Sequence, residues 1–102
     1  MVFSDQATAI QRDVSWTRGV RLISNIGALD IETWTFTCKL FSSAGSLLKT
    51  IAGEIVADDC ALFNLTPEET AALAAGTGRW EVWAIRPDNY KLCLVKGRAT
   101  II

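Results

Sequence analysis

Histidine is absent from the 102-residue sequence, and its absence excludes a large part of enzyme chemistry. Without it neither a Ser-His-Asp nor a Cys-His catalytic site can form, and the commonest general base and metal ligand are missing. The paired carboxylates at 58–59 and 68–69 are sequence neighbours, whose side chains point apart in extended chain or turns. We therefore predict that the protein is not an enzyme, with no catalytic residue, metal site or cofactor.

An excess of charge is also missing, since ten Lys and Arg stand against eleven Asp and Glu. A net charge of -1 creates no field that attracts nucleic acid or an anionic membrane surface. No apolar run approaches the roughly 18 residues of a membrane span. Residues 1–13 lack the basic segment and apolar core of an export signal. We expect no nucleic acid and no membrane as partners, and synthesis in a cytoplasm without export.

Cysteines are few, odd in number and widely spaced, at Cys38, Cys60 and Cys93. This spacing matches neither a disulfide framework nor a zinc or redox motif. We predict buried free thiols, because unpaired cysteine behaves as a small hydrophobe in protein cores.

What the sequence does contain is period-two alternation, clearest over residues 33–41. Trp34, Phe36, Cys38 and Leu40 share one face there, and Thr and Lys occupy the other. Further strands are predicted at 16–24, 47–57, 60–65, 79–85 and 91–102.

Turn-forming residues separate these strands, which predicts an all-β fold: an antiparallel immunoglobulin-like sandwich of about six to seven strands. Gly53 predicts a bulge or bend within its strand, and Gly97 a second bulge. Residues 1–15 show no period and are predicted to form an N-terminal arm. Residues 16–102 are predicted to form the sandwich domain.

A single short helix is predicted at 67–75, between two strands. Thr66 suits the N-cap and Pro67 the first helical position, while Glu69 completes a T-x-x-E capping box. The glycines that follow residue 75 are expected to end the helix. Its role is structural, to carry the chain from one sheet to the other.

Hydrophobic residues make up half of the sequence and include four Trp and four Phe. A small sandwich has one core, so strand faces opposite that core still carry apolar side chains. We predict that these side chains form an interface with another protein. The predicted interface residues are Trp83, Ile85, Cys93, Val95, Ile101 and Ile102. A one-residue slip in the face assignment is the alternative, because it exchanges core and surface.

Three arginines, Arg12, Arg18 and Arg21, surround Trp16 near the N-terminus. Basic and aromatic residues together are one feature of single-stranded nucleic-acid surfaces. The balanced overall charge favours a solvated edge or a protein contact at these residues instead.

The order of the motifs resembles a known family. WTRGVRL, TWTFTCKLF, LTPEETAAL, RWEV and LVKGRATI follow one another over residues 16–102. This series resembles the small β-sandwich modules of tailed-phage virions and is similar to the N-terminal immunoglobulin-like domain of phage baseplate upper proteins. The matching positions are Leu65, Thr66, Glu69, Thr70, Leu73, Gly78, Trp80, Val82, Gly97 and Ile101. All are packing or backbone positions, so the resemblance bears on fold and context more than on activity.

The resemblance implies a non-enzymatic virion structural protein, an adaptor in the tail, baseplate or fibre-attachment region. Its expected partners are other virion proteins and copies of itself, with a trimer favoured. A capsid decoration protein is an alternative, in which residues 1–13 reach the next subunit. A carbohydrate-binding module is another, in which exposed tryptophans stack on sugars. The candidates for such stacking are Trp16, Trp34, Trp80 and Trp83.

Overall fold

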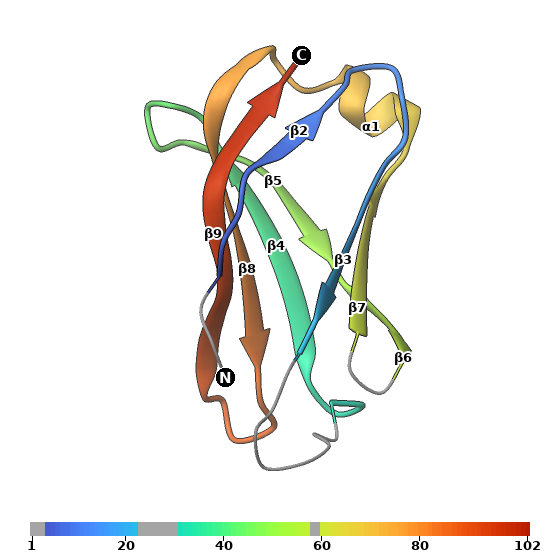
Figure 1. Cartoon of the computed structure of the whole chain (residues 1–102), viewed down its shortest axis with the longest axis vertical. Helices are drawn as coiled ribbons and strands as arrows, with labels where there is room; N and C mark the ends of the chain where they lie inside the picture. Colours follow the sequence, from blue (N-terminus) through green and yellow to red (C-terminus); the bar gives the residue numbers. More distant parts are fainter. Residues whose placement is uncertain (1–3, 23–30, 58–59) are drawn as a thin grey trace.

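The computed structural model describes residues 4–22, 31–57 and 60–102, with side chains from residue 6 onward, as two facing β-sheets (Figure 1). The large sheet contains β1 (Ser4–Asp5), β2 (Thr8–Ile10), β4 (Thr35–Phe41), β5 (Leu47–Ala52), β8 (Gly76–Ile85) and β9 (Lys91–Ile101). The small sheet contains β3 (Trp16–Arg21), β6 (Glu54–Ala57) and β7 (Cys60–Leu65). The one helix of the described residues, α1 (Pro67–Ala71), connects β7 to β8 at one end of the sandwich.

The strand order is β1-β9-β8-β4-β5 in the large sheet, where β2 also pairs with β9, and β3-β7-β6 in the small sheet. The predicted β-sandwich is therefore confirmed, although the described residues contain more strands than the predicted six to seven. The alternation in β4 holds, because Phe36, Cys38 and Leu40 are all buried. Trp34 precedes the strand and lies half-buried against the same core.

Gly53 is the point where the chain passes from one sheet to the other. It separates β5 from β6, so residues 47–57 form an edge strand of each sheet in succession. Its N–H donates to the Phe36 carbonyl at 2.8 Å. A Cβ at this position would lie 2.8 Å from both Phe36 Cβ and Phe63 Cε1, too close for any side chain. The predicted bend at Gly53 is confirmed, and the predicted turn at 58–59 lies outside the described residues.

The helix begins as predicted. The Glu69 N–H donates to Thr66 Oγ1 at 3.2 Å, and the Thr66 N–H donates to Glu69 Oε1 at 3.0 Å, which completes the capping box. The hydrogen bond from the Thr66 backbone, and then the neighbouring Lys49, lower the pKa of Glu69. Such local bonds are encoded within four residues, which is why the sequence alone located them.

The helix ends at Ala71, four residues before the predicted end. Alanine favours helix at 71–75, but Leu73 is buried in the core and β8 already starts at Gly76. Tertiary packing therefore overrides local propensity. Gly76 and Gly78 belong to β8 and do not end the helix. At Gly78 a Cβ would overlap the Phe41 carbonyl, so the close approach of β4 excludes a side chain there.

Replacing Thr66 with alanine is expected to lower the free energy of unfolding by about 1 kcal/mol. The variant loses one half of the capping box, whereas Thr70, which donates to the Val14 carbonyl at 2.8 Å, still anchors the helix. Urea unfolding followed by circular dichroism measures the change. Binding of other proteins should be unaffected, and a loss of assembly at unchanged stability would contradict the structural role.

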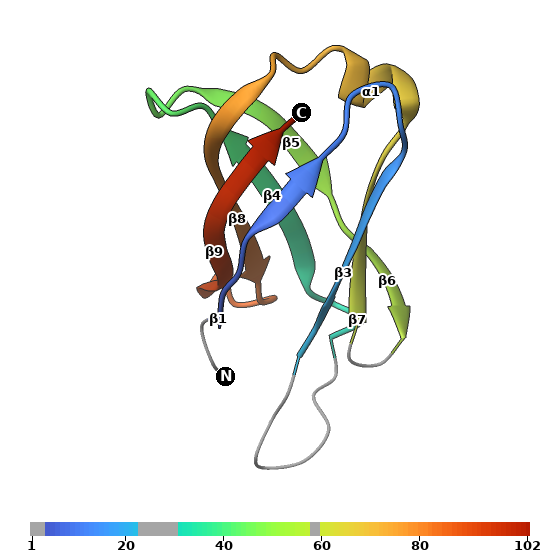
Figure 2. The same ribbon diagram turned by 45° about the horizontal axis from the view of Figure 1, so that its top comes forward.

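The segment expected to be an arm lies, over residues 4–10, within the large sheet. Both β1 and β2 pair in parallel with β9 (Figure 2), so this sheet is not purely antiparallel. Ile10 is fully buried. Between the two strands the Gln6 carbonyl accepts a hydrogen bond from Trp80 Nε1 at 2.8 Å. The same carbonyl fills the space where a Cβ of Gly97 would stand, so Gly97 marks a close backbone approach and not the predicted bulge.

The bulge in β9 occurs at Leu94. Val82 pairs with Val95 and Trp83 pairs with Cys93, which leaves Leu94 as the additional residue. After the bulge the faces of β9 exchange, so Val95 and Ile101 lie in the core, 4% and 6% exposed. The prediction that these two residues form an interface is therefore wrong.

Candidate protein-binding face

The face of the large sheet that points away from the small sheet, here called the outer face, carries a mixture of apolar and charged side chains. The cross-strand pairs define it. Its described side chains belong to Thr35, Thr37, Lys39, Phe41, Leu47, Thr50, Ala52, Thr77, Arg79, Glu81, Trp83, Ile85, Lys91, Cys93, Lys96, Arg98 and Thr100.

Trp83 lies near the centre of this face, where its cross-strand partners are Thr37 and Cys93. Its position in β8 follows from alternation, because Trp80, Val82 and Ala84 face the core. The indole is half-buried, and its Nε1 donates to Glu81 Oε1 at 3.0 Å. This hydrogen bond occupies the indole N–H, while the apolar part of the ring stays partly accessible.

Glu81 also holds Arg79, whose Nε lies 3.4 Å from Glu81 Oε2. The Arg79 guanidinium in turn covers the ring of Phe41, at 4.4 Å from its centroid. This series of contacts orients two aromatic rings and two charges on adjacent strands. Glu81 is thus shared by Trp83 and Arg79, and Asp5 of β1 is the cross-strand partner of Lys96 in β9.

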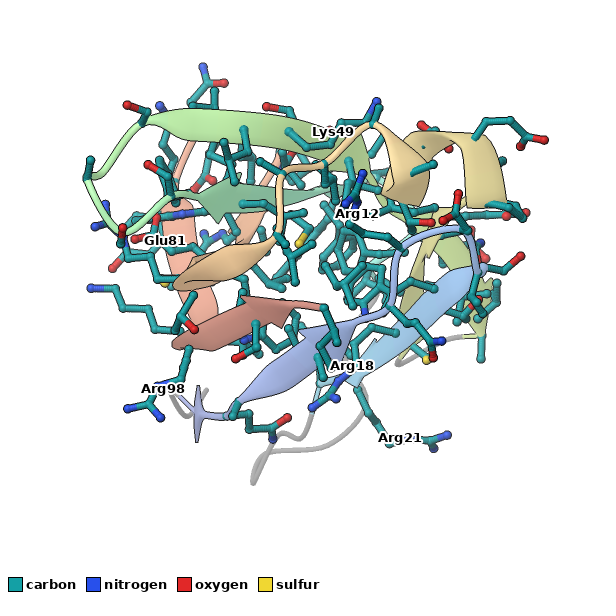
Figure 3. All side chains as sticks on the ribbon, turned by 90° about the horizontal axis from the view of Figure 1, so that it is seen from above. Arg12, Arg18, Arg21, Lys49, Glu81 and Arg98 are labelled. Atoms are coloured by element: carbon teal, nitrogen blue, oxygen red, sulfur yellow. The ribbon has the colours of Figure 1, made fainter. Side chains whose placement is uncertain are left out.

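Those cations give the outer face a strong positive charge. Five basic residues, Lys39, Arg79, Lys91, Lys96 and Arg98, outnumber Glu81, the one carboxylate of this face whose side chain the structure describes. Figure 3 shows Glu81 and Arg98 on the side of the large sheet away from the small sheet. The sequence as a whole has a net charge of -1. The excess of basic residues on this face therefore arises from folding and cannot be seen in the composition.

Cys93 lies among these charges. Partial burial, and then the nearby Glu81, raise the pKa of its thiol, whereas Lys96 lowers it. Cys38, in contrast, lies in the core, where burial raises its pKa to about 12. All three cysteines are free. The prediction of a buried thiol is confirmed for Cys38, and Cys60 and Cys93 are half-buried.

The structure thus places some of the predicted interface residues on the surface and others in the core. Trp83, Ile85 and Cys93 lie together on the outer face, and Ile102 is exposed at the end of β9. Val95 and Ile101 are core residues, as described above. Sequence reasoning missed the polar half of the face, although the alternation in TWTFTCKLF already placed Thr37 and Lys39 opposite the core.

The three arginines near Trp16 do not form a common surface. The Arg12 Nη2 donates to the Ala71 carbonyl at 3.2 Å, near the end of α1. Arg18 lies 5.2 Å from the Trp80 ring centroid and its Nη2 donates to Gln6 Oε1 at 2.7 Å. Figure 3 shows Arg12 well separated from Arg18 and Arg21. At least two of these arginines make contacts within the sandwich, and the three are not gathered around Trp16.

The tryptophans do not offer a sugar-stacking platform either. Trp16 and Trp80 are 7% and 0% exposed and meet edge to face, with ring centroids 6.3 Å apart. Trp34 stacks against Phe36, and Trp83 is half-buried. Two open, neighbouring rings are therefore missing among these four side chains.

The residues that the structure describes are 4–22, 31–57 and 60–102. Within these ranges no group of three or more His, Cys, Asp or Glu residues is placed to hold a metal ion. The helix found in the same ranges is too short to cross a lipid bilayer.

The sequence matches no protein-family model and no curated protein. Solved structures, however, share its fold. A chain in a structure of T-cell activation by the bacterial superantigen toxic shock syndrome toxin-1 is 9% identical, with a TM-score of 0.58 over 94% of this chain and 92% of that one.

Two further structures concern voltage-gated sodium channel β subunits. One, from a cross-linking study of their cell-adhesive interactions, is 13% identical, with a TM-score of 0.55 over 100% of this chain and 95% of that one. The other is a parallel homodimer of the β4 extracellular domain. It is 14% identical, with a TM-score of 0.52 over 100% and 96% of the two chains. At these identities the likeness concerns the fold alone, and it defines the chain as an immunoglobulin-like β-sandwich.

Proposed function

We propose that the chain is a non-enzymatic binding module that joins an assembly through the outer face of its large sheet. The partner is another protein that presents carboxylates around an apolar centre. The observation that carries this proposal is the half-buried Trp83, set beside Cys93 and Ile85 and surrounded by five basic residues. A central aromatic with a charged rim is the composition expected of a protein interface.

The motif resemblance supports a more specific form of the proposal, a virion structural protein that acts as an adaptor in a phage tail, baseplate or fibre attachment. A capsid decoration protein with a free N-terminal arm is less favoured, because residues 4–10 pair with β9 of the same chain. Sugar binding is less favoured because Trp16 and Trp80 are buried. The extracellular domain of the sodium channel β4 subunit forms a parallel homodimer, which supports oligomerisation of this chain as well.

Basic faces with aromatic residues also occur in proteins that bind single-stranded nucleic acid. The ring of Phe41 is covered by Arg79, and Glu81 occupies the middle of the face, where it would repel phosphate. Both observations favour a protein partner.

The test uses a photo-activated cross-linker placed at residue 39 in cells that make the chain and its assembly. It should trap a protein through an acidic segment, and the same cross-linker at Thr17 on β3 should not. Co-sedimentation of the chain with purified tail particles should weaken about tenfold or more in Arg98→Glu, and should fall as salt rises. Thr17→Glu is the matched control. Equal retention of both variants would overturn the proposed face, and cross-linking to nucleic acid would overturn the class of partner.

A further inference from the structure

We infer that the chain also pairs with a second copy of itself through the free edge of β5, so that two large sheets become one continuous sheet. This inference goes beyond the proposed function, because it concerns a different surface. β5 is the last strand of the large sheet, and β4 is its one neighbour there. One side of its backbone therefore offers hydrogen-bonding groups that another strand can satisfy.

The alternation of hydrogen bonds between β4 and β5 shows which backbone groups of β5 face the free edge. The Gly53 N–H donates to the Phe36 carbonyl at 2.8 Å, and Ile51 is the partner of Cys38. Hydrogen-bonded pairs alternate along an antiparallel ladder, so Ile51 and Gly53 turn their backbone groups toward β4. Thr50 and Ala52 consequently turn theirs outward, toward the free edge.

The side chains along this edge are unusually apolar for a free strand. Leu47, Leu48 and Val56 are 55%, 39% and 52% exposed. They are three of the six large hydrophobics that are exposed among the described residues, and all three lie within residues 47–57. Because β5 and β6 are edge strands of the two sheets in succession, these side chains follow one side of the sandwich.

Proteins commonly protect such an edge with lysine or proline. Residues 47–57 contain no proline, and their one lysine is Lys49. The Lys49 Nζ lies 3.1 Å from Glu69 Oε2, next to α1, so its charge is engaged within the sandwich (Figure 3). The edge has one bulge, at Leu48, where the register with β4 shifts, and Thr50–Ala52 beyond it stay open to strand pairing.

Charge favours a second copy at this edge and opposes one at the outer face. Two identical outer faces would set Lys39 and Arg98 of one copy against the same cations of the other. At the edge, Lys49 and Glu69 cancel each other, so two copies meet without repulsion. A two-fold register centred on Thr50 pairs Thr50 with itself in the phase derived above, and the bulge at Leu48 interrupts the regular ladder on either side of this pair.

Such isologous pairing closes as a dimer, not as the trimer predicted from the sequence. It also leaves the outer faces of both copies open, side by side on one extended sheet. Self-pairing and the binding of an acidic protein are therefore compatible in the same assembly.

The first test is sedimentation velocity of the purified chain across micromolar concentrations. The native chain should dimerise, and Thr50→Lys should raise the dimer dissociation constant about tenfold or more, because it sets two like charges opposite each other. Thr50→Pro should act similarly, since it removes the outward N–H without breaking the ladder to β4. Thr17→Lys, on an edge strand of the small sheet, should leave the dimer unchanged. If the native chain stays monomeric, the inference is wrong, even if a strand of another protein pairs with this edge.

The second test detects the register directly. A hydrogen-bonded cross-strand pair separates Cα atoms by about 5.5 Å, within the range that a disulfide spans. Thr50→Cys should therefore form a covalent dimer under mild oxidation, whereas the native chain and Thr17→Cys should not. A dimer that persists in Thr50→Lys, with no crosslink in Thr50→Cys, would show that another surface mediates self-association.

Discussion

Trp80→Ala is expected to lower the free energy of unfolding by about 3–5 kcal/mol, a large part of the roughly 5–15 kcal/mol of a typical domain. Trp80 is fully buried and meets Trp16 edge to face. Its Nε1 binds the Gln6 carbonyl, and Arg18 covers its ring. Alanine would leave a cavity and would also remove the donor that the Gln6 carbonyl binds. Urea unfolding followed by circular dichroism measures the loss.

The matched control is Trp83→Ala, the same substitution on the opposite face of the same strand. Trp83 is half-buried and lies on the outer face, so its removal should cost far less stability than that of Trp80. Trp80→Phe should fall between the two, because it keeps an aromatic ring but leaves the Gln6 carbonyl without its donor. Equal losses in Trp80→Ala and Trp83→Ala would mean that the two faces of β8 are assigned incorrectly.

Gly53→Ala is expected to destabilise the protein by about 1–3 kcal/mol, although it adds a single methyl group. That methyl group would lie 2.8 Å from both Phe36 and Phe63, where the chain crosses between the sheets. Neither ring can yield easily, since both are buried in the core. Thermal unfolding should show a clear fall in the midpoint temperature.

Gly19→Ala is the control for this prediction. A Cβ at Gly19 would meet the Cys60 sulfur at 3.6 Å and Leu62 Cδ1 at 3.7 Å, which are ordinary contacts. Its stability should be close to that of the native chain, or slightly higher, because alanine has less backbone freedom to lose on folding. If both alanine variants behaved alike, crowding at Gly53 would not be the reason for the glycine.

Local signals in the sequence predicted the fold well where the deciding contacts are close in sequence. The alternation of β4 and the capping box at Thr66 and Glu69 each depend on residues within a few positions of one another. The bend at Gly53 was also predicted, since an isolated glycine inside a strand pattern marks a bend or a close approach.

Two features escaped prediction because they depend on pairing between strands and not on a local pattern. Residues 4–10 have no period of their own, and they become strands through pairing with β9. The bulge at Leu94 is set by the register with β8, and it moved Val95 and Ile101 into the core. A pattern of period two cannot reveal an inserted residue, so Val95 and Ile101, which follow the bulge, were assigned to the wrong face.

The candidate site was predicted only in part for a related reason. Trp83, Ile85 and Cys93 are apolar residues at surface positions, which the strand pattern reveals. The concentration of five cations on the same face comes from β4 and from the β8–β9 hairpin, which lie far apart in the chain. The net charge of the sequence cannot show this concentration, because it does not depend on where the charged residues lie in the fold.

The parallel pairing of β1 and β2 with β9 has a consequence for how the chain acquires its structure. The first described strands need residues 95–101 as partners, and the Ile102 N–H closes this seam by donating to the Ile10 carbonyl at 2.9 Å. During synthesis, residues 4–10 leave the ribosome first, and they stay unpaired with β9 until nearly the whole sandwich has emerged. Pairings between such distant segments fold slowly, so the last step of maturation should be the docking of the beginning of the sandwich onto its end.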